Sequence, residues 1–230
     1  MTEIGSQGVF TAEEFLAAIK PRDHPIYPPT TLVEVENTHN RAGGVVFPQD
    51  EAVRICASAR KLGIASYLDG ARLWNVAAAT GSSLSELAAP FDLVAVSLSK
   101  GLGAPGGSLL AGSRDIVARA RRHRRMMGGA VRQVGIFAAA GIFALDYNMT
   151  RLVEDHANAH LIADHLAKCR RIAIDLATVQ TNILVFGLAP DAPDAMVLVS
   201  NARARGVLIN AFGPRTVRAV THLDVSRDQC

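Results

Sequence analysis

The chain has 230 residues, of which 49% are hydrophobic and 20% charged, and its formal net charge is +3 at pH 7. This length and composition are enough to bury a core and exclude a disordered chain. Charges, Gly or Pro interrupt the apolar runs, and the first residues lack the basic and apolar regions of a signal peptide. The three cysteines, Cys56, Cys169 and Cys230, are far apart. Their spacing argues against a disulfide or zinc framework, so we expect a cytoplasmic protein with no membrane partner.

The first hundred residues alternate between strand and helix patterns. A capping box from Thr11 to Glu14 predicts a short helix, and a proline-rich connection follows it. We expect strands over residues 32–36, 65–69 and 93–98, and a helix over residues 48–62 between the first two. The strand over residues 93–98 is continuously apolar, which predicts burial on both faces. The alternation is typical of a parallel sheet with crossover helices, so the sequence predicts an α/β fold.

Charged side chains stand at the ends of two of these strands. Asp69 ends one strand, with Arg72 shortly after it, and Lys100 follows another strand at a glycine-rich turn. The carboxyl ends of parallel strands meet at one edge of a sheet, where ligands bind. The chain has only four lysines, and a desolvated lysine, unlike an arginine, can lose its proton and form a Schiff base. Pyridoxal phosphate requires this pair, because the lysine holds the cofactor and the carboxylate keeps its ring nitrogen protonated.

The same glycine-rich turn has two other interpretations. Residues 101–106 match the dinucleotide pattern G-x-G-x-x-G after a strand. However, residues 108–111 have a strand pattern rather than a helix pattern, and Pro105 lies inside the loop, which disfavours a dinucleotide site. The remaining alternative is that Lys100 is an ordinary solvated lysine in a surface turn.

The middle of the chain is predicted to be helical. Five arginines fall between residues 119 and 125, on a helix that begins after Ser113. No aromatic residue interleaves with them, so we favour a solvated face or an anion site at a subunit contact over a nucleic-acid patch. A strongly apolar helix over residues 131–148 is expected to be buried between domains or subunits. His156 and His160, on a helix over residues 150–170, lack further ligands, so no metal site is predicted.

The last part of the chain has the pattern of a small α/β domain. Strands are predicted over residues 181–186, 206–209 and 216–220, and a helix over residues 192–205. We therefore expect a large domain over residues 1–145 and a small C-terminal domain over residues 146–230. The pattern after Asp224 is typical of the beginning of a helix, which predicts that the small domain is incomplete.

Five stretches, in the same order along the chain, resemble the threonine aldolases, which are pyridoxal-phosphate lyases of the β-eliminating lyase superfamily. They are ENTHNRAGG (residues 36–44), LDGARLWN (68–75), SLSKGLGAPGGSLLAG (97–112), MGGAVRQ (127–133) and VRAVTHLDVS (217–226). The resemblance covers nearly the whole chain. It implies the PLP-dependent transferase-like fold (fold type I), with a partial large domain and a small α/β domain. It also implies pyridoxal phosphate as cofactor and a homo-oligomer, either a dimer or a tetramer, with no nucleic-acid partner.

The resemblance further implies roles for individual residues. Lys100 matches the Schiff-base lysine, and Asp69 matches the carboxylate that pairs with the pyridine nitrogen. Arg72 matches an arginine near the cofactor and the substrate carboxylate. His39 matches a histidine near the substrate β-hydroxyl, where it would act as a base or a positioning group. Arg218 matches the small-domain arginine that binds the substrate carboxylate.

Two more cofactor contacts are implied. Ser97 lies in the matching SLSK stretch, and Arg132 matches an arginine that reaches the phosphate bound by a neighbouring subunit. Structural alternatives stay open for the site residues, such as an ion pair between Arg72 and Asp69, or a loop-stabilising role for His39.

The implied reaction is the cleavage of L-threonine or L-allo-threonine to glycine and acetaldehyde by retro-aldol chemistry. Before the region that begins here, family members carry a glycine-rich phosphate-binding turn, a histidine that stacks on the cofactor and a serine near the carboxylate. We therefore expect a chain truncated at its N-terminus relative to the family. The alternatives are a non-catalytic remnant, or a pyridoxal-phosphate enzyme that performs β-elimination or transamination.

Overall fold

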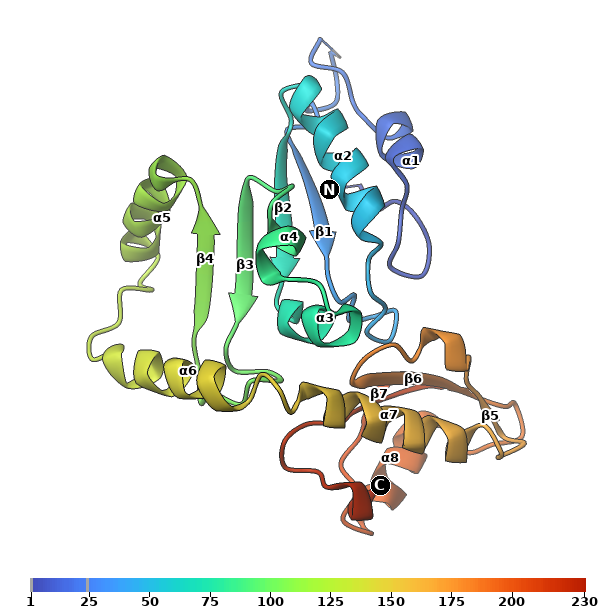
Figure 1. Ribbon diagram of the computed structural model, residues 1–230. Helices are drawn as coiled ribbons and strands as arrows, with labels where there is room; N and C mark the ends of the chain where they lie inside the picture. Colours follow the sequence, from blue (N-terminus) through green and yellow to red (C-terminus); the bar gives the residue numbers. More distant parts are fainter. Residues whose placement is uncertain (1, 24) are drawn as a thin grey trace.

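The computed structural model describes residues 2–23 and 25–230, which form two four-stranded sheets (Figure 1). The first part contains α1 (Ala12–Ala17), β1 (Leu32–Glu36), α2 (Gln49–Lys61), β2 (Ala65–Gly70), α3 (Leu73–Thr80), α4 (Leu84–Ala88), β3 (Leu93–Ser97) and β4 (Ser108–Gly112). Three helices follow: α5 (Arg114–Met126), α6 (Gly135–Tyr147) and α7 (Leu152–Leu166). The last part contains β5 (Ile172–Ala173), the short helix η1 (Leu176–Thr178), β6 (Ile183–Leu188), α8 (Ala195–Arg203), β7 (Asn210–Gly213), β8 (Thr216–Val220) and the short helix η2 (Arg227–Gln229).

The first sheet has the strand order β1-β2-β3-β4, and its first three strands are parallel. The pairing register places Asp69 of β2 beside Glu36 of β1 and Ala95 of β3. The predicted parallel arrangement is confirmed for these strands, so their carboxyl ends meet at one edge. Strand β4 pairs antiparallel to β3. Only a short glycine-rich turn separates the two, and a parallel strand would need a longer crossover.

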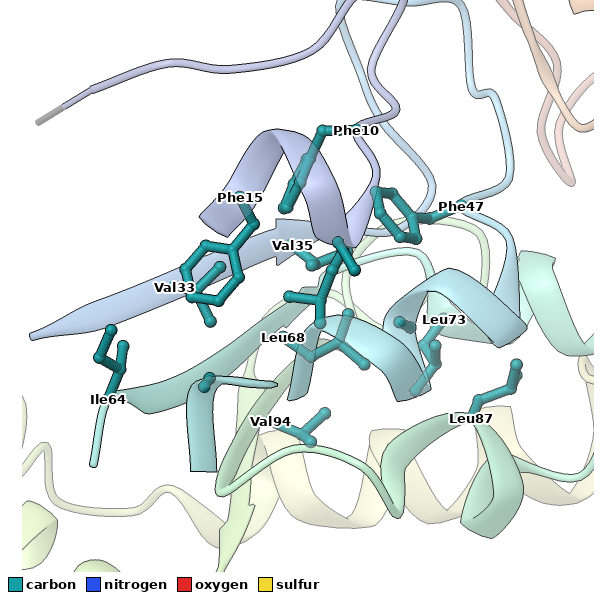
Figure 2. Close-up of a cluster of buried hydrophobic side chains, with 14 of the residues drawn as sticks. Phe10, Phe15, Val33, Val35, Phe47, Ile64, Leu68, Leu73, Leu87 and Val94 are labelled. Carbon is teal, nitrogen blue, oxygen red and sulfur yellow. The ribbon is translucent and has the colours of Figure 1, made fainter. Parts of the chain in front are cut away.

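The main apolar core lies on one face of this sheet, where helices α1–α4 and strands β1–β3 contribute most of the side chains of the cluster in Figure 2. Alternate residues of a strand point to the same face, so Val33 and Val35 of β1 and Leu68 of β2 all enter the core. Phe15 of α1 packs against them. The other face of β1 and β2 carries Asp69 and its alternating neighbours, which are exposed or half-buried.

The predicted burial of β3 on both faces is wrong. Of the five residues of β3 only Val94 is buried, and the others are half-buried. The core covers one face of the sheet, so the apolar residues that alternate with Val94 point away from it. A continuous apolar run thus failed to distinguish a strand covered on two faces from one covered on one.

The second sheet has the strand order β5-β6-β8-β7, and its pairs are antiparallel. Helix α7 packs on it through a cluster that contains Ala159, Ala163 and Leu184. The strand predicted over residues 206–209 is wrong, because pairing with β8 begins only at Asn210. The preceding segment is exposed, with Leu208 77% exposed.

Helix α6 is confirmed as an apolar helix, but most of its surface is uncovered in the single chain. Ile136 is 70% exposed, Ile142 62% and Phe143 59%, whereas only Gly141 and Ala144 are buried. The expected burial of this helix between domains is therefore wrong for those side chains. Burial at a subunit contact stays a prediction.

Among the described residues, no single helix is long and apolar enough to cross a membrane. Helices α6 and α7 pass that test of length and composition only when taken together, and the pair bends by 73° at its break.

A buried polar network joins the two parts of the chain. Asn75 of α3 places its Nδ2 at 3.1 Å from Nε2 of His156, on α7, and at 3.4 Å from Oδ1 of Asn182, just before β6. Asn182 in turn donates to the carbonyl of Thr221 at 2.9 Å, just after β8. All four residues are at most 7% exposed. Buried polar groups are costly unless they are paired, so this network fixes how α3 meets the second sheet.

The network requires a neutral His156. The amide nitrogen of Asn75 can only donate, so Nε2 of His156 must accept, and the proton of the neutral ring is assigned to Nδ1. Burial, together with the charge of His160, lowers the pKa of His156 from 6.5 to about 4. Between these two values the unfolded chain binds a proton that the folded chain does not, so stability falls as the pH falls.

We predict that replacing this histidine makes the stability less sensitive to acid. In the wild-type chain the free energy of unfolding should lose up to about 3 kcal/mol between about pH 7 and about pH 4 through His156. His156→Gln keeps an acceptor but cannot titrate, so its loss should be smaller by that amount. Urea unfolding across this range measures the difference. His165→Gln, an exposed change on the same helix, should keep the wild-type profile. Equal acid sensitivity in His156→Gln and the wild type would contradict the prediction.

Candidate active site

A cavity of about 460 Å³ lies between the second sheet and the carboxyl ends of the parallel strands of the first sheet. Arg72 follows β2, Lys100 follows β3, and Arg218 belongs to β8, so three cations from distant parts of the sequence face one space. The other lining residues are Ser99, Gly101, Gly103, Ala104, Asn182, Val220, His222, Leu223 and Asp224.

A second hollow of about 480 Å³ lies against α7 and the C-terminal residues. Arg151, Asn158, Asp224 and Arg227 are among its lining residues. Neither Lys100 nor another sequence-predicted site residue lines it, so we place the site in the cavity between the sheets.

The turn that carries Lys100 depends on glycines. A Cβ atom at Gly101 would lie 3.0 Å from Oδ1 of Asn75 and 3.0 Å from Leu152. At Gly103, where φ is +74°, a Cβ would lie 2.2 Å from Leu223. Larger residues would push the turn away from these neighbours, which confirms the predicted tight turn after β3.

The electrostatic surroundings of Lys100 favour its neutral amine. Although the residue as a whole is exposed, its side chain lines the cavity, and this partial burial is the main cause that lowers its pKa. The positive charge of Arg72 lowers the pKa further, and Arg218 adds a smaller effect in the same direction. The negative charges of Asp69 and Glu36 act in the opposite direction. A lysine with a lowered pKa can act as a nucleophile nearer neutral pH.

Asp69 is half-buried at the end of β2, on the sheet face away from the core. Its Oδ1 accepts a hydrogen bond of 3.0 Å from the backbone N–H of Ala71. Its charge helps to raise the pKa values of Glu34 and Tyr67, after the larger effect of their own burial. The negative charge of Asp69 therefore acts on the amine of Lys100, although Asp69 does not line the cavity.

Arg72 is held by polar contacts on one side and faces the cavity on the other. Its Nη2 donates to Oδ1 of Asn40 at 3.2 Å, and its Nη1 lies 4.0 Å from Oε1 of Glu36. Its side chain is 11% exposed, and burial lowers the pKa of its guanidinium. The alternative of a structural ion pair between Arg72 and Asp69 is not observed among the described residues. The carboxylate that pairs with Arg72 is Glu36.

His39 lies beside the site but does not line the cavity. Its Nδ1 accepts from the backbone N–H of Ala42 at 3.2 Å, and its Nε2 lies 3.5 Å from Glu36. A neutral imidazole has one acceptor nitrogen, and in this arrangement Ala42 occupies it. His39 would therefore have to leave the Ala42 contact before it could accept a proton from a substrate.

The structure does not bring every predicted residue to the cavity. Arg218 lines it, and the Nε of Arg218 is buried without a hydrogen-bond partner among the described residues. Ser97 lies one step away, with its hydroxyl 3.3 Å from that of the lining residue Ser99. Arg132 is exposed in the segment between α5 and α6 and does not line the cavity.

Four polar side chains that line the cavity were not predicted from the sequence: Ser99, Asn182, His222 and Asp224. Ser99 directly precedes Lys100 and His222 lies in the VRAVTHLDVS stretch, so both carried a signal. Asn182 carried none, because only the packing of β6 against α3 brings it to the cavity. Within residues 2–23 and 25–230, no group of three or more His, Cys, Asp or Glu side chains is arranged to hold a metal ion.

We predict that removing the charge of Arg72 raises the pKa of Lys100. Arg72→Met keeps most of the side-chain volume but removes a positive charge that disfavours the protonated amine. Competitive acetylation with acetic anhydride, quantified by mass spectrometry as a function of pH, measures this pKa. Lys61, an exposed residue at the end of α2, serves as the internal reference. An unchanged or lower pKa for Lys100 in the variant would refute the assignment.

Comparisons with known proteins agree with this geometry. Residues 2–188 match the family described as beta-eliminating lyase. The low specificity L-threonine aldolase of Escherichia coli O157:H7 is 42% identical over 227 residues, which cover 99% of this chain and 65% of the relative. The low-specificity L-threonine aldolase 1 of Arabidopsis thaliana is 34% identical over 95% of this chain and 62% of its own length. The chain thus spans about two thirds of the length of these curated relatives, just under that fraction in each case.

Solved structures show the same fold. A putative L-allo-threonine aldolase from Listeria monocytogenes has a TM-score of 0.75 at 22% identity, over 93% of this chain and 59% of that one. The threonine aldolase of Leishmania major has a TM-score of 0.77 at 17% identity, over 100% of this chain and 66% of that one. The predicted α/β fold of fold type I is therefore confirmed. With this fold and a family match over most of its length, the chain belongs to the beta-eliminating lyase family.

Proposed function

We infer that this chain forms the core of a pyridoxal-phosphate lyase of the threonine aldolase type, which cleaves L-threonine or L-allo-threonine to glycine and acetaldehyde. The observation that carries this proposal is the placement of Lys100, whose pKa is lowered, in a cavity shared with Arg72 and Arg218 and near Asp69. The names of its relatives support the proposal.

The residues of the cavity suit pyridoxal phosphate. Lys100 offers an amine whose pKa is lowered, and Asp69 offers a carboxylate for the pyridine nitrogen. Arg72 and Ser97 lie at the ends of the same strands and would contact the cofactor. In the proposed oligomer, Arg132 of one chain would reach the phosphate bound by its neighbour, which accounts for its exposure here.

When bound, the cofactor would supply an electron sink for the bond broken between Cα and Cβ. The chain's own groups bind and orient the substrate. Arg218, whose Nε is buried without a hydrogen-bond partner among the described residues, would donate to the substrate carboxylate together with Arg72. His39, once released from Ala42, would take the proton of the β-hydroxyl, and Glu36 would hold its other ring nitrogen.

We further propose a domain organisation, an oligomeric state and a cellular location for the protein. We assign residues 1–145 to a large cofactor-binding domain and residues 146–230 to a small domain, because each range contains one of the two sheets. The exposed apolar side chains of α6 support a homo-oligomer, a dimer or a tetramer. The three cysteines are free thiols, which suits the reducing cytoplasm.

The proposal predicts a visible absorption band on addition of pyridoxal phosphate and the release of acetaldehyde and glycine from threonine. Lys100→Ala should lose the band and lower cleavage by about a thousandfold or more, since it removes the group that holds the cofactor covalently. Asp69→Asn should keep the band but lower kcat by about a hundredfold, because the ring nitrogen is no longer kept protonated. Lys61→Ala, on the exposed side of α2, is the matched control and should behave as wild type.

The products separate this proposal from its alternatives. β-Elimination of threonine gives 2-oxobutanoate and ammonia instead of acetaldehyde and glycine, and transamination leaves a 2-oxo acid. A folded wild-type protein, verified by circular dichroism, that gave no band at saturating cofactor would instead indicate a non-catalytic member of the family.

A further inference from the structure

Phe212 occupies an irregular position in β7. The pairing of β7 with β8 shifts register between Ala211 and Gly213, so Phe212 has no partner across the ladder. An irregularity of this kind re-aims the side chain of the extra residue. Here the ring of Phe212 faces guanidinium groups, whereas the neighbouring Ala211 packs against the apolar cluster that contains Phe186 and Val217.

Two arginines from different parts of the chain lie against this ring. The Cζ of Arg218, on β8, is 5.3 Å from the centroid of Phe212. The Cζ of Arg41, in the loop after β1, is 5.9 Å from the same centroid. Both distances are within the range in which a cation is attracted to the face of an aromatic ring. The ring therefore links the loop that follows His39 to the strand that carries Arg218.

Arg218 is half-buried, but it lacks the polar contacts that usually fix such an arginine. Its Nε is buried without a hydrogen-bond partner, and within the described residues no carboxylate forms an ion pair with it. Burial and the charge of Arg72 lower the pKa of its guanidinium, and no carboxylate of the described residues offsets this shift. A buried N–H without a partner is costly, and a carboxylate ligand would remove that cost.

We propose that Phe212 is a positioning residue that holds the guanidinium of Arg218 through the face of its ring and leaves the N–H groups free for the carboxylate of an amino acid. This inference rests on the proposed function, in which Arg218 binds that carboxylate. An acidic partner would hold Arg218 as well, but it would compete with the ligand. An aromatic ring fixes the cation without occupying its donors.

The contact itself can be tested in cofactor-free protein, independently of any activity. In a spectrum of protein labelled with ¹⁵N-arginine, the Nε–H signal of Arg218, identified by its loss in Arg218→Lys, should carry a ring-current shift. Phe212→Leu removes the ring but keeps an apolar side chain, so it should remove that shift. Phe143→Leu, the same change on exposed α6, should leave the signal unchanged. A signal that Phe212→Leu does not move would overturn the proposal.

The positioning role is tested with cofactor-loaded protein. Phe212→Leu should weaken glycine binding and raise KM for threonine about 3- to 10-fold, with kcat within about 2-fold of wild type. Phe212→Tyr, which restores a ring face, should recover most of the loss. In an Arg218→Lys background, Phe212→Leu should have little further effect, because its role acts through Arg218. If Phe212→Leu lowers the thermal stability but leaves the glycine affinity unchanged, Phe212 contributes only to packing, and the proposal is overturned.

The two proposals fail in different ways. If wild-type protein forms no visible band with pyridoxal phosphate, the proposed function fails, and the ring-current experiment still decides whether Phe212 holds Arg218. If wild type cleaves threonine and Phe212→Leu binds glycine equally well, the proposed function stands and the role of Phe212 is refuted.

Discussion

The parallel pairing of β1, β2 and β3 is the constraint on which the rest of the site depends. Because these strands run in the same direction, the groups that follow them meet at one edge of the sheet. Asp69 and Lys100 reach this edge from neighbouring strands, and Arg72 follows from the same strand as Asp69. The second sheet then closes the space from the opposite side and contributes Arg218. A shift of one residue in the register of β2 would turn Asp69 to the other face of the sheet.

The charge balance of the cavity follows from this arrangement. Three cations, Arg72, Lys100 and Arg218, line it together with one carboxylate, Asp224. The pKa of each cation is lowered, by burial first and by neighbouring positive charge for Lys100 and Arg218. The cations repel one another while the cavity holds no anion, so this surplus of positive charge favours the binding of an anionic ligand. An amino-acid carboxylate and a phosphate group both meet that requirement, which ties the electrostatics to the proposed function.

The sequence predicted the parts of this account that local patterns determine. Strand ends carry short-range signals, so Asp69 and Lys100 could be assigned from spacing and residue type. The roles of His39, Arg132 and Arg218 came only from resemblance to a family. The strand predicted at residues 206–209 was wrong, because an apolar run does not determine which residues pair with a neighbouring strand. Pairing with β8 begins only at Asn210. Asn182 and the ring of Phe212 depend on packing between distant segments, for which no local pattern exists.

We propose that Lys100 is the lysine that holds pyridoxal phosphate. The most direct test is to incubate the protein with the cofactor, reduce it with borohydride and map the modified peptide by mass spectrometry. The chain has only four lysines, so the assignment is unambiguous. We expect stoichiometric modification of Lys100 with little at Lys20, Lys61 or Lys168. Modification spread over those three lysines, or none at all in folded protein, would contradict it.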